Sequence, residues 1–350
     1  MKPLFVEPRT TPLFCGGPEE IKGMLDPLCR LETELADGLA LYWKTAEKIL
    51  DGSGIHLAQP GPGAVSLERN FFSALFLYSY YRCRVAEDRR ILYAAVNQCL
   101  RGMVTGCDNL LDDEYKETLE TDLPKEGTRF RSVLDIMVSE RVLFEILLDR
   151  VERGDIQAEM LRNAVRASLR ALTRSGSQEA SEQAGVSGRR LPPDEVLSTV
   201  HHFKTGLLFQ CPWALPAVIE RPLPNGIAHV KNALYTIGIA CQMLDDMVDL
   251  ARDVRQRRHN YVASVIAWGS DKSLKGLLSE MVCSDSPKLY LDAFYSPLRE
   301  VYQLAMKNLA EALRVLFLED HQGLVAPSAA FIAARIGADR ILSPHGRGSA

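Results

Sequence analysis

The chain contains 350 residues, of which 47% are hydrophobic, and it carries a formal net charge of −4. This length and hydrophobic fraction are sufficient for a large buried core. The modest charge, without a basic patch or tail, excludes the surface on which nucleic-acid binding depends, so no nucleic-acid partner is expected.

Cysteine usage and the N-terminal sequence indicate a cytoplasmic protein. The eight cysteines are scattered without a CxxC pair, and most lie in apolar helical segments, as reduced core cysteines do. Pro3, Pro8 and Pro12 interrupt the first residues, which lack the apolar stretch of a signal peptide. The longest strongly apolar run, 71–81, is roughly half of a membrane span, so at most peripheral membrane contact is expected.

Helical spacing of apolar residues dominates the chain, and no segment shows strand periodicity. We therefore predict a single all-α domain over residues 1–350, with an irregular N-terminus (1–18) and a disordered tail (342–350). Residues 52–65 and 174–190 are expected to be loops. Helices are predicted at 18–50 (as two helices), 67–84, 88–111, 131–153, 155–172, 194–209, 227–253, 270–281, 290–317 and 328–341.

The segment 240–261 contains the most informative pattern. Asp245, Asp249 and Asp253 recur every four residues, with Asp246 beside them, so on a helix the three carboxylates share one face. Like charges at this spacing repel one another, and a divalent cation such as Mg²⁺ would compensate them. An ordinary solvated acidic face is the alternative interpretation.

Two further groups belong to this pattern. Arg255, Arg257 and Arg258 follow the acids and are able to hold phosphate oxygens bidentately, unless they are only a solvated turn. Upstream, Asp108 and Asp112 again stand four residues apart near the end of a predicted helix. Two acidic pairs on separate helices can hold metal ions that share one diphosphate.

The sequence resembles the polyprenyl synthetase family of trans-isoprenoid diphosphate synthases, whose helical bundle carries two DDxxD motifs. Asp245-Asp246-Met-Val-Asp249 matches the second motif, and Asp108-Asn109-Leu-Leu-Asp112 matches the first with Asn in place of its second Asp. The resemblance covers roughly residues 60–340. It implies a helical bundle of the isoprenoid synthase type, an allylic prenyl diphosphate as substrate, about three Mg²⁺ ions bound with it, and a homodimer.

The resemblance also assigns roles to individual residues. Lys204 and Thr205 resemble the family's Lys-Thr pair, whose lysine contacts the allylic diphosphate, and Gln242 resembles the glutamine that precedes the second motif. Asp253 fits the looser second metal motif of terpene synthases. The predicted catalytic residues are Asp108, Asp112, Asp245, Asp246, Asp249 and Lys204; the predicted metal ligands are Asp108, Asp112, Asp245, Asp249 and Asp253; the predicted substrate-binding residues are Arg69, Arg101, Lys204, Thr205, Gln242, Arg255 and Arg258.

The expected site for isopentenyl diphosphate departs from the family pattern. Of the family's GGKxxR loop only Arg69 remains, and Arg101 stands where the family has His or Gln. No Arg-Arg pair follows the first motif, and Lys116 is the nearest cation. A buried second diphosphate needs clustered positive charge, which is thinned here.

Three functions therefore stay open. The first is a terpene synthase-like enzyme that ionises one allylic diphosphate; this is the main expectation. The alternative is a chain-elongating synthase that adds isopentenyl diphosphate through Arg69, Arg101 and Lys116, and the third is a non-catalytic regulatory subunit. His201, His202 and His259 have no ligand partners at metal spacing and receive no role.

Overall fold

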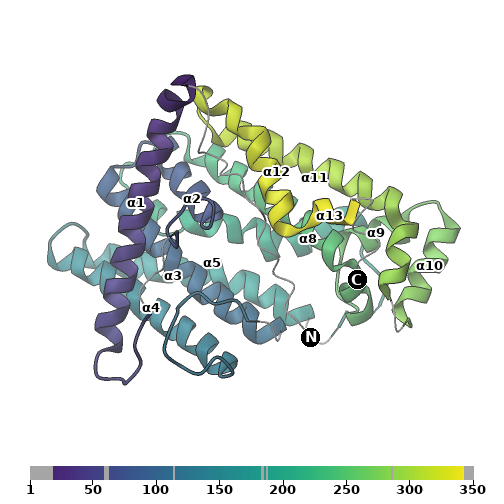
Figure 1. Cartoon of the computed structure of the whole chain (residues 1–350), viewed down its shortest axis with the longest axis horizontal. Coiled ribbons are helices and arrows are strands. Elements are labelled where there is room, and N and C mark those ends of the chain that lie inside the picture. The colour runs from purple at the N-terminus through teal and green to yellow at the C-terminus, as the bar shows by residue number, and fades with distance from the viewer. Residues whose placement is uncertain are drawn as a thin grey trace. The chain divides into compact units, whose positions relative to one another are not determined.

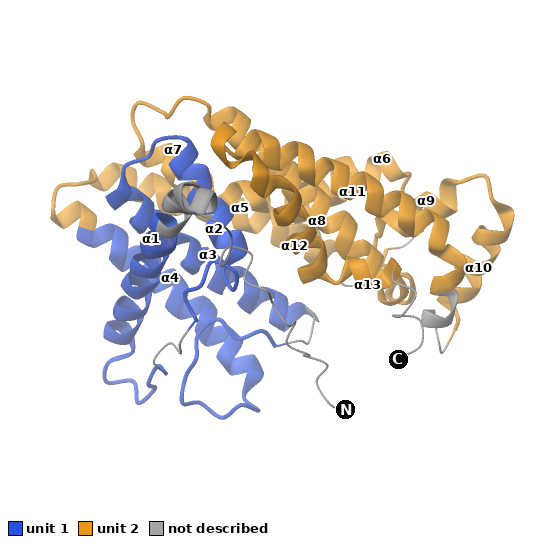
Figure 2. Ribbon diagram, turned by 45° about the horizontal axis from the view of Figure 1, so that its top comes forward, with its two compact units in different colours: residues 1–149 blue, residues 150–350 orange. Residues whose placement is uncertain are grey.

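A computed structural model describes residues 19–58, 63–112, 115–182, 185–186, 188–284 and 287–342. These residues form helices joined by short connections, with an isolated bridge between Leu57 and Thr121 and no strand among them (Figure 1). The predicted all-α class is confirmed. The chain divides into two compact units, 1–149 and 150–350, which are described separately (Figure 2). The predictions for 1–18 and 343–350 lie outside the described residues.

Unit 1 is built on the long helix α1, which packs against α2 and α3. Leu35, Leu39 and Tyr42 follow one another on one face of α1 and are at most 2% exposed. A Cβ at Gly38 would lie 2.5 Å from the Cβ of Ala94, so this glycine allows α1 and α3 to approach closely. The helices of unit 1 are α1 (Glu19–Leu50), α2 (Phe71–Arg82), α3 (Glu87–Asp112) and α4 (Thr128–Glu152).

Unit 2 is organised around α8, which packs against α11, α12, η1 and η2. Leu244, Met247 and Leu250 of α8 are fully buried, which accounts for the hydrophobic character of this helix outside its acidic row. The elements of unit 2 are α5 (Ala158–Glu182), α6 (Pro193–Glu195), η1 (Val196–Gly206), η2 (Leu208–Trp213), α7 (Pro216–Ile219), α8 (Ile227–Gln256), α9 (Tyr261–Trp268), α10 (Lys272–Val282), η3 (Pro287–Phe294), α11 (Tyr295–Leu316), η4 (Glu319–Leu324), α12 (Val325–Ile336) and α13 (Ala338–Leu342).

Several predicted elements differ from the structure. The helix predicted at 328–341 is divided at Gly337, whose φ of 92° ends α12 before α13 begins. The segment 18–50, predicted as two helices, forms one helix from Glu19 to Leu50, whose buried stripe runs from Leu31 to Leu50. The polar segment predicted as a connection from 174 is helical as far as Glu182, where tertiary contacts override its low apolar content. The helix predicted at 194–209 is mainly a π-helix, η1, a rare form that often occurs at functional sites.

Two further observations bear on expected surfaces. None of the described helices is both long and apolar enough to cross a membrane.

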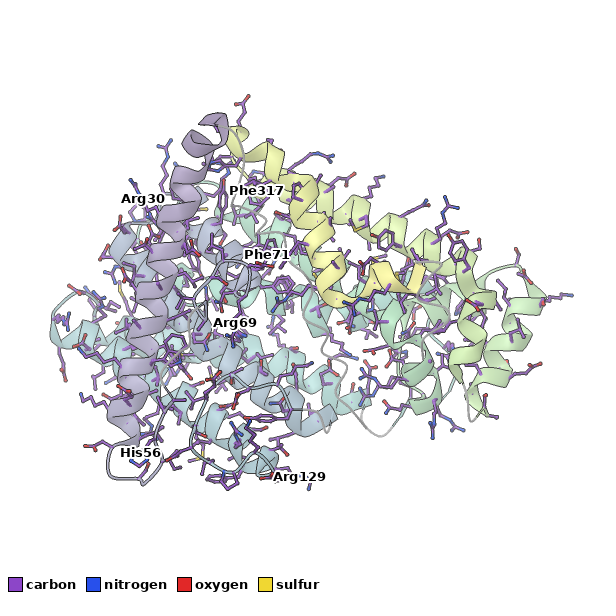
Figure 3. The ribbon with its side chains drawn as sticks, viewed as in Figure 1. Arg30, His56, Arg69, Phe71, Arg129 and Phe317 are labelled. Atoms are coloured by element: carbon purple, nitrogen blue, oxygen red, sulfur yellow. The ribbon has the colours of Figure 1, made fainter. Side chains whose placement is uncertain are left out.

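Figure 3 shows Arg69 and Phe71 at the start of α2. Phe71 is 4% exposed and Arg69 is exposed, so adjacent parts of this segment serve the core and the surface.

Candidate active site

The acidic residues of α8 fall into two classes. Asp245 and Asp249 are partly exposed and lie one helical turn apart, whereas Asp246 and Asp253 are 2% and 7% exposed. The row from Asp245 to Asp253 covers about 12 Å of the helix. The sequence pattern therefore combines two accessible carboxylates with two that the protein interior surrounds.

Asp246 is held by three donors from different elements. Its carboxylate accepts hydrogen bonds from Nε2 of His201 at 2.9 Å, Nε2 of Gln242 at 3.0 Å and the backbone N–H of Tyr261 at 2.5 Å. Burial alone would raise the pKa of Asp246, but the charge and hydrogen bond of His201 and the other donors lower it. Asp246 is thus a buried, ionised carboxylate that links α8 to η1 and α9.

Asp253 is engaged in a similar way by Asn260. The Nδ2 group of Asn260 donates to Oδ2 of Asp253 at 2.9 Å and to the backbone carbonyl of Asp246 at 2.7 Å. Its Oδ1 accepts from the N–H of Ala263 and caps α9. Burial, followed by the charge of Asp246, raises the pKa of Asp253 to about 8. These contacts favour Asp245 and Asp249 over Asp246 and Asp253 as groups that meet a ligand.

Asp245 and Asp249 have the properties of a divalent-cation site. Burial and then the charge of Asp249 raise the pKa of Asp245 to about 7, so the pair destabilises its own negative charge. Such a pair of oxygen ligands fits Mg²⁺, which completes its shell with water and phosphate oxygens. In the described part of the chain no group of three or more His, Cys, Asp or Glu side chains lies close enough together to hold a metal ion without other ligands.

Lys204 supplies the positive charge of this site. It lies on η1, and its Nζ is 3.1 Å from Oε1 of Glu179 on α5. Burial would lower the pKa of Lys204, but the charges of Glu179, Asp246 and Glu182 outweigh it and raise the pKa. Lys204 is therefore protonated at physiological pH and is ready to pair with an anion.

The surroundings of Lys204 fix it against α8. The Oγ of Ser175 on α5 donates to the backbone carbonyl of Lys204 at 2.8 Å, and Oγ1 of Thr205 donates to the carbonyl of His201 at 3.4 Å. A Cβ at Gly238 of α8 would lie 2.6 Å from the carbonyl oxygen of Thr205. The glycine therefore permits η1 and α8 to pack in direct backbone contact.

The basic residues after the acidic row lie at the end of α8. Arg257 adopts a left-handed conformation with φ 57° and closes the helix. Arg255 and Arg257 are exposed, and Arg258 is partly exposed. Arg252, which the sequence analysis did not single out, donates to Oδ2 of Asp249 at 2.5 Å. Its spacing of three residues from Asp249 is a local signal that sequence reasoning could have used.

In unit 1 the first acidic motif ends α3. Asp108 is exposed, and the side chain of Asp112 lies outside the described residues. Asn109 is 5% exposed; its Nδ2 donates to the carbonyl of Lys116 at 3.0 Å, and its Oδ1 accepts from the N–H of Lys116 at 2.8 Å. An ionised Asp at this position could accept but could not donate. The departure from DDxxD therefore has a structural cause, because the amide fixes the segment after α3.

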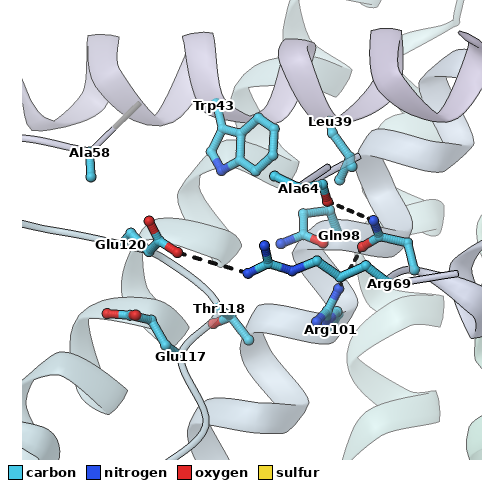
Figure 4. A pocket seen from close by; sticks show the side chains of 11 residues that line it. Leu39, Trp43, Ala58, Ala64, Arg69, Gln98, Arg101, Glu117, Thr118 and Glu120 are labelled. Atoms are coloured by element: carbon cyan, nitrogen blue, oxygen red, sulfur yellow. Dashed lines mark hydrogen bonds and ion pairs between the residues drawn. The ribbon is translucent and has the colours of Figure 1, made fainter. Parts of the chain in front are cut away.

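Arg69 and Arg101 line one pocket of unit 1, whose cavity volume is about 60 Å³ (Figure 4). Nη1 of Arg101 donates to Oδ1 of Asn70 at 3.0 Å, and Nη2 of Arg69 lies 3.9 Å from Oε1 of Glu120. Glu120 thus lies beside Arg69, whereas the other lining glutamate, Glu117, is paired with Arg131 outside the pocket. The lining consists of Leu39, Trp43, Ala58, Ala64, Arg69, Asn70, Gln98, Arg101, Glu117, Thr118 and Glu120.

Comparison with known proteins identifies the architecture. No family model and no curated protein matches the chain significantly. A polyprenyl synthase from Roseobacter denitrificans is 15% identical with a TM-score of 0.55, and a geranylgeranyl pyrophosphate synthetase from Pyrococcus horikoshii is 16% identical with a TM-score of 0.55; each match covers 88% of this chain and 99% of the other. The chain has the polyprenyl synthase fold.

A third structure of this fold gives the same result. The geranylgeranyl pyrophosphate synthase from Corynebacterium glutamicum, complexed with isoprenyl diphosphate and magnesium, is 14% identical with a TM-score of 0.53, and the match covers 87% of this chain and 99% of that one. The helical bundle predicted from the sequence is therefore confirmed as a polyprenyl synthase fold. At this identity the similarity concerns the fold, and the site residues stay predictions.

Within the polyprenyl synthase fold, the structure groups the predicted residues by unit. Lys204, Thr205, Gln242, Asp245 and Asp249 occur together on η1 and α8 of unit 2. Arg69 and Arg101 share a pocket in unit 1, whereas Lys116 does not line it. The residues that the sequence analysis missed are Glu179, Arg252 and Asn260, and it gave His201 no role; apart from Arg252, these residues are revealed only by tertiary contacts.

Proposed function

We propose that the chain is a Mg²⁺-dependent prenyltransferase that ionises an allylic prenyl diphosphate and joins the allylic chain to isopentenyl diphosphate. The observation that carries this proposal is the grouping of protonated Lys204 with the carboxylates of Asp245 and Asp249 on two elements in direct contact. The fold supports it, because the structures compared above are prenyl diphosphate synthases.

The charges of the site suggest a role for each residue in binding the metal or the diphosphate. Asp245 and Asp249 would hold Mg²⁺, which stabilises the negative charge of the departing diphosphate. Asp108 and Asp112 of the first motif are proposed as metal ligands in unit 1. Lys204 would pair with the phosphate oxygens, and Thr205, Arg255 and Arg258 are proposed to help bind them. Gln242, expected from the sequence to bind substrate, is buried, and its amide donates to Asp246 and Asp245 instead. Breaking the C–O bond releases diphosphate and leaves an allylic cation. The C=C bond of isopentenyl diphosphate would attack this cation to form the new C–C bond, and loss of a proton to the released diphosphate would restore a double bond.

Elongation is favoured over the terpene synthase-like reaction that the sequence analysis put first. The solved structures with the same fold are polyprenyl and geranylgeranyl diphosphate synthases. The pocket of unit 1 also brings together Arg69 and Arg101, the two cations expected to bind a second diphosphate. Arg101 stands two helical turns before Asp108 on α3, so both residues lie on the same side of this helix.

A single-substrate cyclase is the second candidate, and one observation favours it. Glu120 lies 3.9 Å from Arg69 in the same pocket and offsets part of its positive charge, which a second diphosphate would need. The third hypothesis, a non-catalytic regulatory subunit, would be excluded if the purified chain alone releases diphosphate.

Reversing the charge of Arg101 separates the two candidates. In an elongating enzyme Arg101→Glu should lower the rate of product formation with isopentenyl diphosphate roughly 100-fold, because a charged hydrogen bond to the diphosphate is replaced by repulsion. Product analysis by mass spectrometry after incubation with farnesyl and isopentenyl diphosphates measures this effect. Arg82→Glu, the same change at an exposed residue of unit 1, is the control and should have no effect. Full elongation by the Arg101 variant would contradict the proposed site.

A homodimer is proposed with the exposed face of α4 as its interface. Phe130, Val133, Met137 and Phe144 lie on one side of α4 and are 36–61% exposed, which is unusual for a monomer. Light scattering should give twice the chain mass of 39.0 kDa, and Met137→Glu should give the mass of a single chain. Leu169→Glu, at an exposed leucine of α5, should stay dimeric. A monomeric wild-type protein would contradict this assignment.

A further inference from the structure

A histidine without an assigned role stands at the centre of the unit 2 site. His201 is 1% exposed and lies on η1, three residues before Lys204. Its Nε2 is 2.9 Å from Oδ2 of Asp246, which is also buried. Because the ionised carboxylate can only accept, Nε2 is the donor in this contact. The pair therefore joins the element that carries Lys204 to the helix that carries the acidic row.

A second set of hydrogen bonds links Asp246 to Asp245, which is partly exposed. Nε2 of Gln242 donates to Oδ1 of Asp246 at 3.0 Å and also approaches Oδ2 of Asp245 at 3.3 Å. Gln242 is 4% exposed, so packing restricts its amide to this orientation. A continuous series of hydrogen bonds thus runs from His201 through Asp246 and Gln242 to Asp245.

We propose that His201 is a positioning residue that orients Asp245 through Asp246 and Gln242 and fixes Lys204 relative to Asp245. The inference rests on the proposed role of Asp245 as a metal ligand. Groups that hold a ligating side chain commonly contribute 10–100-fold to metal affinity, roughly as much as a weak ligand itself. His201 touches neither metal nor substrate, and its effect would therefore appear in the dependence on Mg²⁺.

The alternative is that His201 only stabilises the fold. Its neighbour His202 provides a matched comparison, because it lies on the same π-helix and makes an equivalent hydrogen bond, Nδ1 to the hydroxyl of Tyr235 at 2.9 Å. Tyr235 belongs to α8 but lies far from the acidic row along the helix. His202 is partly exposed and its partner is a neutral hydroxyl, so it tests whether losing any hydrogen bond from η1 to α8 raises the Mg²⁺ requirement. A positioning role belongs to His201 alone.

The experiment measures the Mg²⁺ dependence of inorganic pyrophosphate binding by isothermal titration calorimetry, together with the Mg²⁺ concentration for half-maximal diphosphate release. His201→Phe should raise that concentration about tenfold or more. His201→Gln, which keeps a donor, should recover part of the loss, and His202→Phe should match the wild type. Circular dichroism checks that each variant is folded.

A second variant guards against misfolding of His201→Phe. Gln242→Leu leaves the pair of His201 and Asp246 intact but removes the link to Asp245, and it should raise the Mg²⁺ requirement to a similar extent. An unchanged Mg²⁺ requirement in folded His201→Phe or in Gln242→Leu, or an equal loss in His202→Phe, would overturn the inference. If the wild type binds no pyrophosphate at any Mg²⁺ concentration, the proposed function itself fails.

Discussion

Replacing Asp245 or Asp249 with Asn should lower diphosphate release about 1,000-fold. Each carboxylate is expected to hold Mg²⁺ against the departing diphosphate, and loss of several kcal/mol of charge stabilisation corresponds to about three powers of ten in rate. The raised pKa of Asp245 supports this prediction. The site disfavours the ionised form of Asp245 when no cation is bound, and a bound cation would stabilise that same ionised form. The rate of pyrophosphate release at saturating Mg²⁺ measures the effect.

The control for this prediction is Asp292→Asn, which makes the same change at an exposed carboxylate of unit 2. That variant should keep the wild-type rate. Glu179→Gln is informative in addition, because it removes the partner of Lys204 without touching the acidic row. If Asp245→Asn and Asp249→Asn retain more than about a tenth of the activity, the acidic row is not the metal site.

Gly238→Ala should destabilise the protein by roughly 1–3 kcal/mol and reduce activity at the same time. The new Cβ would lie 2.6 Å from the carbonyl oxygen of Thr205 and 2.9 Å from Cγ of Phe209. Because the first of these atoms belongs to the backbone, η1 must move away from α8, and Lys204 moves with it. Urea unfolding followed by circular dichroism measures the loss of stability.

Gly176→Ala is the matched comparison. Gly176 also lies inside a helix, α5, but a Cβ there would have no atom within 4 Å. Alanine is the better helix former by up to about 1 kcal/mol, so this variant should be as stable as the wild type or more stable. Equal stabilities for the two variants would contradict the close packing of η1 on α8.

Much of the fold was predictable because periodic burial is a local property. The stripe of Leu35, Leu39 and Tyr42 and the apolar faces of α8 and α11 are visible as helical spacing in the sequence. The helical segment 174–182 was not, since Ser175 and Glu182 are polar residues that long-range partners bury. The π-helical form of η1 has no recognised sequence pattern and depends on packing against α8.

The candidate site was predictable in its charges but not in its connections. Regular spacing placed Asp245 and Asp249 on one face, and the Lys-Thr pair indicated Lys204. The partners Glu179, His201 and Asn260 are 7 to 45 residues away from the groups they contact, and sequence spacing does not reveal such contacts. The buried state of Asp246 likewise follows from η1 and α9 and not from the motif, which makes it look equivalent to Asp245.

The most direct test of the proposed function is pyrophosphate release from geranyl, farnesyl and geranylgeranyl diphosphates, each with and without isopentenyl diphosphate. The purified chain should release pyrophosphate from at least one of them, release should stop when EDTA removes Mg²⁺, and longer prenyl diphosphates should form only when isopentenyl diphosphate is present. If hydrocarbon or alcohol forms without isopentenyl diphosphate, the proposed elongation is wrong and the single-substrate cyclase reaction is the function. No release from any of the three substrates would contradict the account as a whole.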